Sequence, residues 1–231
     1  MDSQTEARIT AALRAWVDIR AQQSTASVAG GRAQTGRRAA VTGGKHLEPL
    51  SSLVVGQIEA LGVDGLELRR NRGATLAGYY RPSKSWDLLV LREGQPLLAV
   101  EYKSMSGSEG KNLNNRADEV FGIAEDARAA EANGILPAGL LRAYIFVMGA
   151  NDDSTRPVGA GNVIGNPDPV FEGASYLERM AIMCERMRDA GLYNLVWAVG
   201  VVEDPFSWFE PRASVGWDVF AGTLRTAMGR M

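Results

Sequence analysis

Two apolar segments joined by a short polar turn constrain this chain more than any other feature of its sequence. The segment Trp86–Leu91 is apolar except for Asp87, and Leu97–Lys103 is apolar up to Glu101. Residues 92–96 between them contain Gly and Pro, which favour a turn. Short apolar segments bounded by turn residues are typical of strands, so the sequence predicts a β-hairpin here.

The predicted hairpin brings three charged side chains to one place. Side chains alternate along a strand, so Glu101 and Lys103 share one face. Val100 and Tyr102 occupy the other face. The return of the hairpin carries the charged face back towards Asp87. We therefore expect two carboxylates and one ammonium to converge at the edge of a small sheet.

These residue types are typical of a metal-dependent phosphodiesterase. Two carboxylates with open positions beside them suit Mg²⁺, which keeps several waters and takes one or two carboxylates plus substrate phosphates. Lys103 can orient, or help to deprotonate, a metal-bound water aimed at phosphorus. The alternative is a strand end with a solvated Glu–Lys pair. The adjacent apolar pair Ala99–Val100 favours the first interpretation, because unpaired charges on a core strand are costly.

The same residues resemble the PD-(D/E)XK nuclease signature with its proline step altered. Pro82 lies five residues before Asp87, and Trp86 directly precedes the aspartate. A closer resemblance, to the XhoI-type restriction endonucleases, covers most of the chain from about Gly43 onward. The segments that carry it are YYRPSKSWDLLVL (79–91), AVEYKSMSGSEGKNLNNRADEVFGIAEDA (99–127), GGKHLEPL (43–50), SYLERMAIMCERMRDAGLYN (175–194) and EPRASVGWDVFAGTL (210–224).

The resemblance implies a fold, an activity and partners. It implies an α/β fold with a mixed central β-sheet flanked by helices, built on a restriction-endonuclease-like (PD-(D/E)XK) core. It also implies a Mg²⁺-dependent homodimer that cuts both strands of the DNA palindrome CTCGAG and leaves 5′-phosphates. Asp87 and Glu101 would bind the metal, and Lys103 would act on the attacking water. The loop Ser106–Lys111 departs from the family pattern, so a related target site is the alternative.

A third metal ligand has several candidates. The backbone carbonyl of Val100 or Tyr102 can supply an oxygen. In several nucleases of this fold, a glutamate from the helix before the catalytic strands joins the metal, which makes Glu59 and Glu48 candidates. A surface role is the alternative for both glutamates.

The histidine and cysteine counts exclude several other chemistries. The one histidine, His46, leaves histidine-pair metal sites and histidine acid–base pairs unavailable within a chain. No G-x-S-x-G motif accompanies it, which excludes a typical serine hydrolase. The one cysteine, Cys184, excludes an internal disulfide and a cysteine-rich zinc site. Its spacing within a helical apolar pattern predicts a buried core thiol.

The pattern of apolar residues predicts a single α/β domain over residues 1–231. Helices are expected at 3–23, 47–61, 114–132, 175–190 and 217–228, and further strands at 66–70, 140–148 and 193–202. Residues 24–44 lack apolar periodicity and are interpreted as a mobile basic segment, with a plain linker as the alternative. No long apolar stretch predicts a membrane span and no signal peptide is recognised, so we expect a cytoplasmic bacterial or archaeal protein.

The net charge does not mark the chain as a DNA-binding protein, but the charge is unevenly distributed. The net charge of −2 divides into +4 over residues 1–46 and −6 over the remainder. DNA binding depends on the field near the cleft, so a mildly acidic chain is compatible with it. Candidates for DNA contacts are Arg32, Arg37, Arg38 and Lys45 in or beside the basic segment, Arg72, Arg81 and Lys84 before Asp87, Asn114, Asn115 and Arg116 at an expected helix start, and Arg156 in the loop 149–171.

Three functions are consistent with these residues. The first is a type II restriction endonuclease that acts on double-stranded DNA as a homodimer. The second is a repair or junction nuclease on the same fold. The third is a non-catalytic DNA-binding protein, against which the intact Asp–Glu–Lys set argues, because such a protein has no physical need for that cluster of charges.

Overall fold

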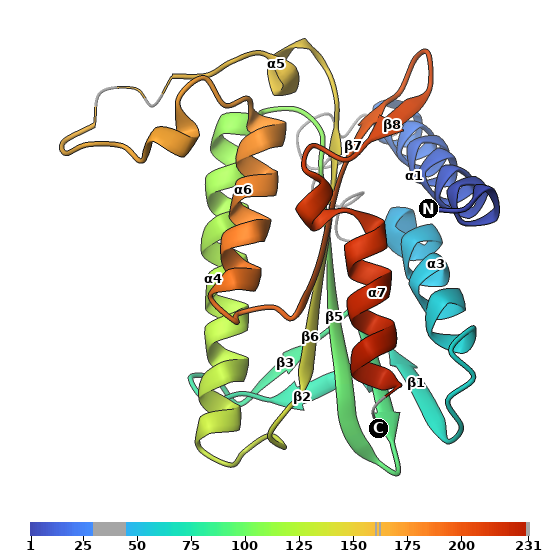
Figure 1. Cartoon of the computed structure of the whole chain (residues 1–231). Helices are drawn as coiled ribbons and strands as arrows, with labels where there is room; N and C mark the ends of the chain where they lie inside the picture. Colours follow the sequence, from blue (N-terminus) through green and yellow to red (C-terminus); the bar gives the residue numbers. More distant parts are fainter. Residues whose placement is uncertain (30–44, 160, 162, 230–231) are drawn as a thin grey trace.

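A six-stranded sheet with helices on both faces forms the body of the molecule (Figure 1). The computed structural model describes residues 1–29, 45–159, 161 and 163–229, with the backbone alone for residues 24–29. The strands, in their order across the sheet, are β1 (Leu66–Arg70), β4 (Leu88–Arg92), β5 (Gln95–Met105), β6 (Leu141–Gly149), β7 (Leu195–Val202) and β8 (Ser207–Phe209). The expected mixed sheet flanked by helices is confirmed.

Strand β5 is the strand at which the sheet changes from antiparallel to parallel pairing. It pairs antiparallel with β4 and parallel with β6, while β7 continues the parallel part. The β4 pairing begins at Leu88, opposite Val100, whereas the β6 pairing continues to Met105. The part of β5 beyond Val100 therefore has β6 on one side and no β4 residue on the other.

Two hydrophobic cores lie on opposite faces of the sheet. Helices α4 (Glu109–Ala132) and α6 (Tyr176–Asp189) cover one face, and α1 (Ser3–Ala29), α3 (Glu48–Glu59) and α7 (Trp217–Met228) cover the other (Figure 1). Trp16 and Trp217 are fully buried in the second core. Both tryptophans therefore stabilise the fold itself and are unavailable at the surface for a subunit contact. Cys184 is a buried free thiol, as expected.

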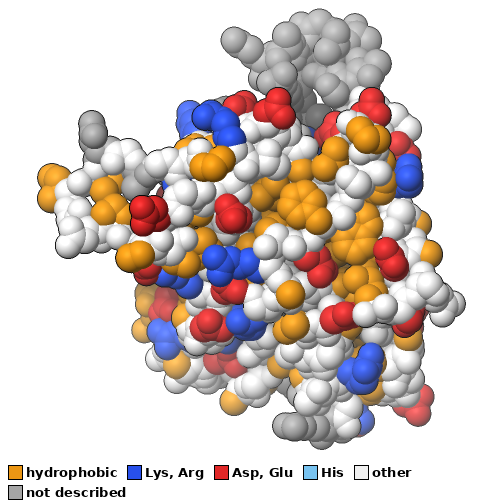
Figure 2. Space-filling view, turned by 45° about the horizontal axis from the view of Figure 1, so that its top comes forward, with side chains coloured by type: hydrophobic (Ala, Val, Ile, Leu, Met, Phe, Trp, Pro, Cys, Tyr) orange, Lys and Arg blue, Asp and Glu red, His pale blue; other side chains and the backbone are white. Residues whose placement is uncertain are grey.

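The remaining elements are short. They are the hairpin strands β2 (Thr75–Ala77) and β3 (Ser83–Ser85), helix α5 (Asp152–Thr155), and the 3₁₀ turns η1 (Lys45–Leu47), η2 (Asn71–Gly73), η3 (Pro169–Phe171) and η4 (Ala213–Val215). The sequence did not predict the β2–β3 hairpin, which forms a separate two-stranded sheet. The segment between α5 and α6 extends from the body (Figure 1), and hydrophobic side chains lie on the projecting arm in Figure 2. Val163 and Ile164 in this segment are exposed.

Two predicted helix boundaries are wrong. The first helix continues from the expected end at residue 23 to Ala29, so the expected mobile segment does not begin at residue 24. Its remainder, 30–44, lies outside the described residues. Helix α4 begins at Glu109 rather than at Asn114. The buried carboxylate of Glu109 accepts hydrogen bonds from the Gly107 N–H (2.8 Å) and the Asn151 amide (3.1 Å), which anchors the earlier start.

Candidate active site

Asp87 lies where β4 enters the sheet, beside the unpaired part of β5. Its backbone N–H donates to the Val100 carbonyl at 3.1 Å, which is the last β4–β5 contact in this direction. Its carboxylate then accepts the Tyr102 N–H at 2.8 Å. The side chain of Asp87 thus replaces the backbone of a missing strand residue, and this hydrogen bond fixes the carboxylate against β5.

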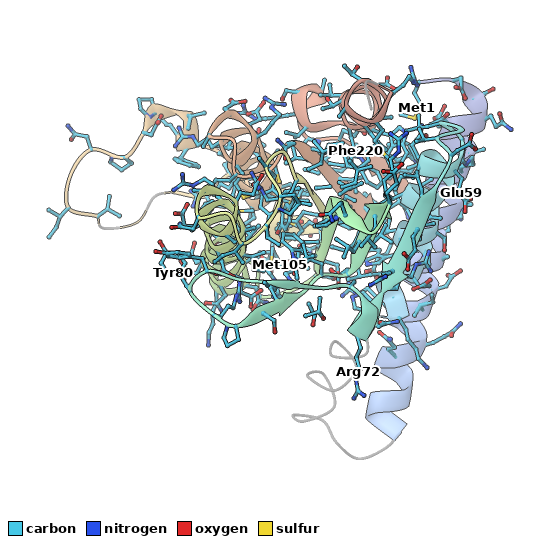
Figure 3. All side chains as sticks on the ribbon, turned by 90° about the horizontal axis from the view of Figure 1, so that it is seen from below. Met1, Glu59, Arg72, Tyr80, Met105 and Phe220 are labelled. Atoms are coloured by element: carbon cyan, nitrogen blue, oxygen red, sulfur yellow. The ribbon has the colours of Figure 1, made fainter. Side chains whose placement is uncertain are left out.

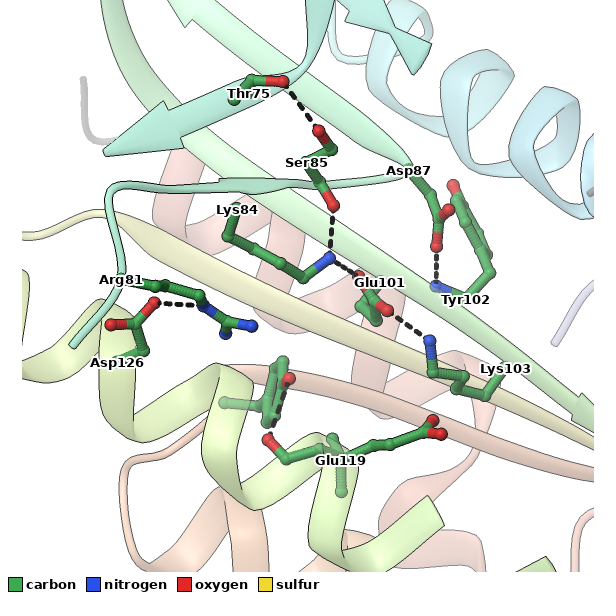
Figure 4. A network of polar contacts seen from close by, with 12 residues as sticks. Thr75, Arg81, Lys84, Ser85, Asp87, Glu101, Tyr102, Lys103, Glu119 and Asp126 are labelled. Carbon is green, nitrogen blue, oxygen red and sulfur yellow. Dashed lines mark hydrogen bonds and ion pairs between the residues drawn. The ribbon is translucent and has the colours of Figure 1, made fainter. Parts of the chain in front are cut away.

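Glu101 and Lys103 lie on the face of β5 that α4 and α6 cover, as the alternation along the strand predicts. Glu101 is only 3% exposed, and both of its carboxylate oxygens are engaged. One accepts from the Lys103 ammonium, and the other accepts from Lys84 at 3.0 Å (Figure 4). Two lysines therefore compensate the charge of one buried carboxylate.

The electrostatics of the site act most strongly on Asp87. Asp87 is exposed to solvent as a residue, although its carboxylate lies against β5, where it accepts the Tyr102 N–H. Desolvation of the carboxyl, together with the nearby negative charge of Glu101, raises the pKa of Asp87 to about 6. The Tyr102 N–H and the two lysines oppose the rise and only partly offset it. A further cation at this point would favour the ionised carboxylate.

The donor set fits a hard divalent cation. The carboxylates of Asp87 and Glu101 are close enough to interact electrostatically, and Mg²⁺ needs only one or two carboxylates because it retains waters. The Val100 carbonyl already accepts the Asp87 N–H. The Tyr102 N–H points to the same edge as Asp87, and its carbonyl shares that edge, which favours Tyr102 over Val100 as the backbone ligand.

Glu59 does not join this donor set. Glu48, at the start of α3, pairs with Arg70 of β1, which places that end of the helix near the sheet. Glu59 is exposed at the other end, roughly 16 Å further along at 1.5 Å per residue (Figure 3). Within the described part of the chain, no group of three His, Cys, Asp or Glu side chains is arranged to hold a metal ion.

The basic residues that precede Asp87 are mostly engaged within the molecule. Arg81 pairs with the buried Asp126 of α4 at 2.8 Å, and Lys84 pairs with Glu101. Arg72 is exposed and projects away from the body of the molecule (Figure 3). Of these three predicted DNA contacts, Arg72 is therefore the one that the fold leaves free to meet a partner.

The other predicted DNA contacts that the structure describes lie on three separate elements: η1, α4 and the segment after α5. Asn114 and Asn115 are exposed within α4 and not at its N-terminus, so the predicted anion site at a helix start is wrong. Arg116 pairs with Glu119 at 2.5 Å. Lys45 is exposed in η1, and the exposed Arg156 pairs with Asp153 at 3.3 Å. Arg32, Arg37 and Arg38 lie outside the described residues.

Sequence reasoning missed the position of Lys84 against Glu101 and the function of Asp126. The Asp126 carboxylate accepts from the backbone N–H groups of Tyr79 (2.9 Å) and Tyr80 (2.7 Å) as well as from Arg81. It therefore holds the tip of the β2–β3 hairpin. A weak signal for Lys84 was present, because it alternates with Ser83 and Ser85 and so occupies the inward position of a short strand.

The fold and the site together define a class of protein. It is a mixed α/β protein with two carboxylates and two lysines beside the part of β5 that pairs with β6 but not with β4. Comparison with known sequences then gives the family. The chain belongs to the restriction endonuclease XhoI family, whose sequence profile matches residues 26–203. Type II restriction enzymes generally require a divalent metal ion, in agreement with the donor set.

Three relatives are named type II restriction enzymes. XhoI of Xanthomonas vasicola is 35% identical over 161 residues, which cover 68% of this chain and 65% of XhoI. BstVI of Geobacillus stearothermophilus is 33% identical over 66% of this chain and 72% of that enzyme. AbrI of Azospirillum brasilense is 40% identical over 39% of this chain and 41% of that enzyme. The chain thus spans slightly less than two thirds of the length of XhoI.

No solved structure matches the chain significantly. Among the helices of the described residues, none is both long and apolar enough to cross a membrane.

Proposed function

We propose that this protein is a type II restriction endonuclease that uses Mg²⁺ to cut both strands of palindromic DNA, at CTCGAG or a related site. The observation that supports this most is the convergence of Asp87, Glu101 and Lys103 on the one part of β5 that β4 leaves open. Membership of the family supports the restriction activity, and the oxygen ligands of the site support a hard cation such as Mg²⁺.

Each residue of the site would have a separate role in phosphodiester hydrolysis. Asp87 and Glu101, with the Tyr102 carbonyl, would hold Mg²⁺, which polarises a phosphoryl oxygen and makes bound water acidic. Lys103 lies against Glu101 and is partly exposed, so its ammonium is placed to orient a water beside that carboxylate. Asp87 must be ionised to take part. Cleavage that leaves 5′-phosphates, as the family implies, is part of the proposal.

The proposed partner is double-stranded DNA. Arg72 and Lys45 are exposed and form no ion pair with the described residues, and both lie before β4 and β5 in the sequence. Together with Arg32, Arg37 and Arg38 they would neutralise phosphates, which makes affinity fall as salt rises. Arg81 and Lys84 are each held by an ion pair with a buried carboxylate, so in the free protein we expect them to shape the site and not to bind phosphates.

Cleavage of a plasmid that contains CTCGAG tests the proposal. With Mg²⁺ the protein should give discrete fragments, and with EDTA it should give none. Asp87→Ala, Glu101→Ala and Lys103→Ala should each abolish cutting, since all three residues serve the metal or the water. Lys103→Ala should still bind the DNA in a gel-shift assay, because the two carboxylate ligands remain.

Other outcomes would point to another function. Cutting restricted to branched DNA would indicate a junction nuclease, and a gel shift without cutting would indicate a DNA-binding protein. Substantial Mg²⁺-dependent cutting by any of the three alanine variants would refute the assigned site.

A further inference from the structure

Two of the four lysines in the chain contact the same buried carboxylate. Lys103 is the lysine that the family signature includes. Lys84 comes from β3, and its ammonium lies 3.0 Å from Glu101, on the oxygen that Lys103 does not occupy. The Lys84 side chain is 16% exposed and that of Glu101 is 3% exposed, so this ion pair is shielded from water.

Each oxygen of Glu101 already accepts a hydrogen bond from an ammonium, so a metal ion that binds Glu101 would compete with Lys84 and Lys103. Asp87 and Glu101 contribute two negative charges, and Lys84 and Lys103 balance them with two positive charges. A divalent cation added to this set would leave two uncompensated positive charges beside the buried Glu101, which is unfavourable. Entry of the metal therefore favours the departure of one ammonium from Glu101.

Lys84 is the lysine that the fold allows to leave. Lys103 follows Glu101 by two residues on the same face of β5, so the strand itself keeps them together. Lys84 belongs to a two-stranded sheet that is separate from the main sheet. Its ammonium also donates to the Ser85 carbonyl and lies 5.4 Å from the centre of the Trp86 ring, so it keeps partners after release.

We propose that Lys84 is the counter-ion of the metal-free site: it holds Glu101 in place and is displaced from that carboxylate when the divalent cation binds. This inference rests on the proposed function, because it concerns the same metal site. Release also frees an ammonium at the point where a DNA phosphate would meet the metal. Lys84 is thus a positioning residue whose contact competes with the metal.

If Lys84 competes with the metal for Glu101, its removal should strengthen metal binding; if Lys84 instead supports the metal site, its removal should weaken metal binding. If Lys84 occupies Glu101 most of the time, the apparent metal affinity is reduced by the fraction of molecules in which the oxygen is free. Lys84→Gln should therefore bind the cation more tightly, by about tenfold for 90% occupancy. Lys84→Arg should bind it less tightly, because a guanidinium grips a carboxylate with two parallel hydrogen bonds.

The experiment titrates DNA-free protein with Mn²⁺, which takes the same oxygen ligands as Mg²⁺, and follows unbound Mn²⁺ by electron paramagnetic resonance. Lys111→Gln is the matched control, since Lys111 is an exposed lysine of α4 that forms no ion pair within the described part of the chain. This variant should leave the affinity unchanged. Thermal unfolding in EDTA supplies a second measurement. There Lys84→Gln should melt below the wild type, and Lys84→Arg should keep the wild-type melting temperature.

The outcomes separate this inference from the proposed function. If the wild type binds no Mn²⁺, or if Glu101→Ala binds as much Mn²⁺ as the wild type, the metal site and both proposals are refuted. A wild type that binds Mn²⁺ while Lys84→Gln binds equally or more weakly would refute the displacement of Lys84 alone. If Lys84→Gln does not fold, an Mn²⁺ affinity of Lys84→Arg at or above that of the wild type would refute it.

Discussion

The charge of the metal-free site depends on pH through the carboxyl group of Asp87. Its pKa is raised in the folded protein from 3.8 to about 6, so the native state favours the protonated carboxyl more than the unfolded chain does. The stability that this difference supplies is fully present below pH 4 and is lost as the pH rises through about 6. In the proposed site the metal would bind the ionised carboxylate, so metal affinity should rise over the same pH interval.

We therefore predict that Asp87→Asn stabilises the metal-free protein more at pH 7.5 than at pH 5. The expected difference is about 1 kcal/mol, less than the full pKa shift would give, because Asp87 is exposed and solvent screens its charge. Urea unfolding of both proteins in EDTA at the two pH values measures it. Burial lowers the pKa of His46, but this residue is present in both proteins, so its contribution to the pH dependence cancels in the comparison. Equal stabilisation at both pH values would contradict the assignment.

At the scale of elements, the buried carboxylate of Asp126 joins α4 to the tip of the β2–β3 hairpin. It accepts three hydrogen bonds, from Tyr79, Tyr80 and Arg81. We predict that Asp126→Ala lowers the free energy of unfolding by about 2 kcal/mol, because it leaves two backbone donors and a guanidinium without their acceptor. The neighbouring Glu125→Ala should cost less than about 0.5 kcal/mol, since its pair with Arg128 is exposed.

Chymotrypsin provides a local measure of the same contact. Tyr79 and Tyr80 are exposed at the hairpin tip, and Asp126 holds the backbone on which they lie. In Asp126→Ala, cleavage after these two tyrosines should become faster at temperatures where the protein is still folded. An unchanged cleavage rate would show that other contacts hold the tip.

Local patterns predicted the β4–β5 hairpin well, because they depend on near neighbours in the sequence. The alternation of apolar and charged residues placed Glu101 and Lys103 on one face and located β4 and β5. The contact of Lys84 with Glu101 joins residues 17 positions apart, and that of Arg81 with Asp126 joins residues 45 apart. Their geometry depends on the β2–β3 hairpin, whose three-residue strands carry too few apolar residues to be recognised.

The start of α4 was missed for a related reason. Glu109 looks like an ordinary surface residue in the sequence. It is buried because Asn151, 42 residues later, donates to its carboxylate. No pattern within the segment itself contains that information.

At the scale of the whole molecule, a palindromic target predicts a homodimer. Two identical half-sites are related by a two-fold axis, and a two-fold symmetric dimer places one active site on each strand. We predict that sedimentation with a short CTCGAG duplex gives a complex of two chains per duplex. A complex of one chain per duplex, accompanied by cutting of one strand only, would instead indicate a nicking or repair nuclease.

The most direct test of the central claim is digestion of a supercoiled plasmid that contains a single CTCGAG site, with a twin plasmid in which one base of that site is changed. The account predicts that the protein with Mg²⁺ converts the first plasmid to linear DNA whose ends map to the site and carry 5′-phosphates. The twin should remain supercoiled, and Glu101→Gln should cut neither plasmid. Equal cutting of both plasmids, or linear product formed by Glu101→Gln, would contradict the account.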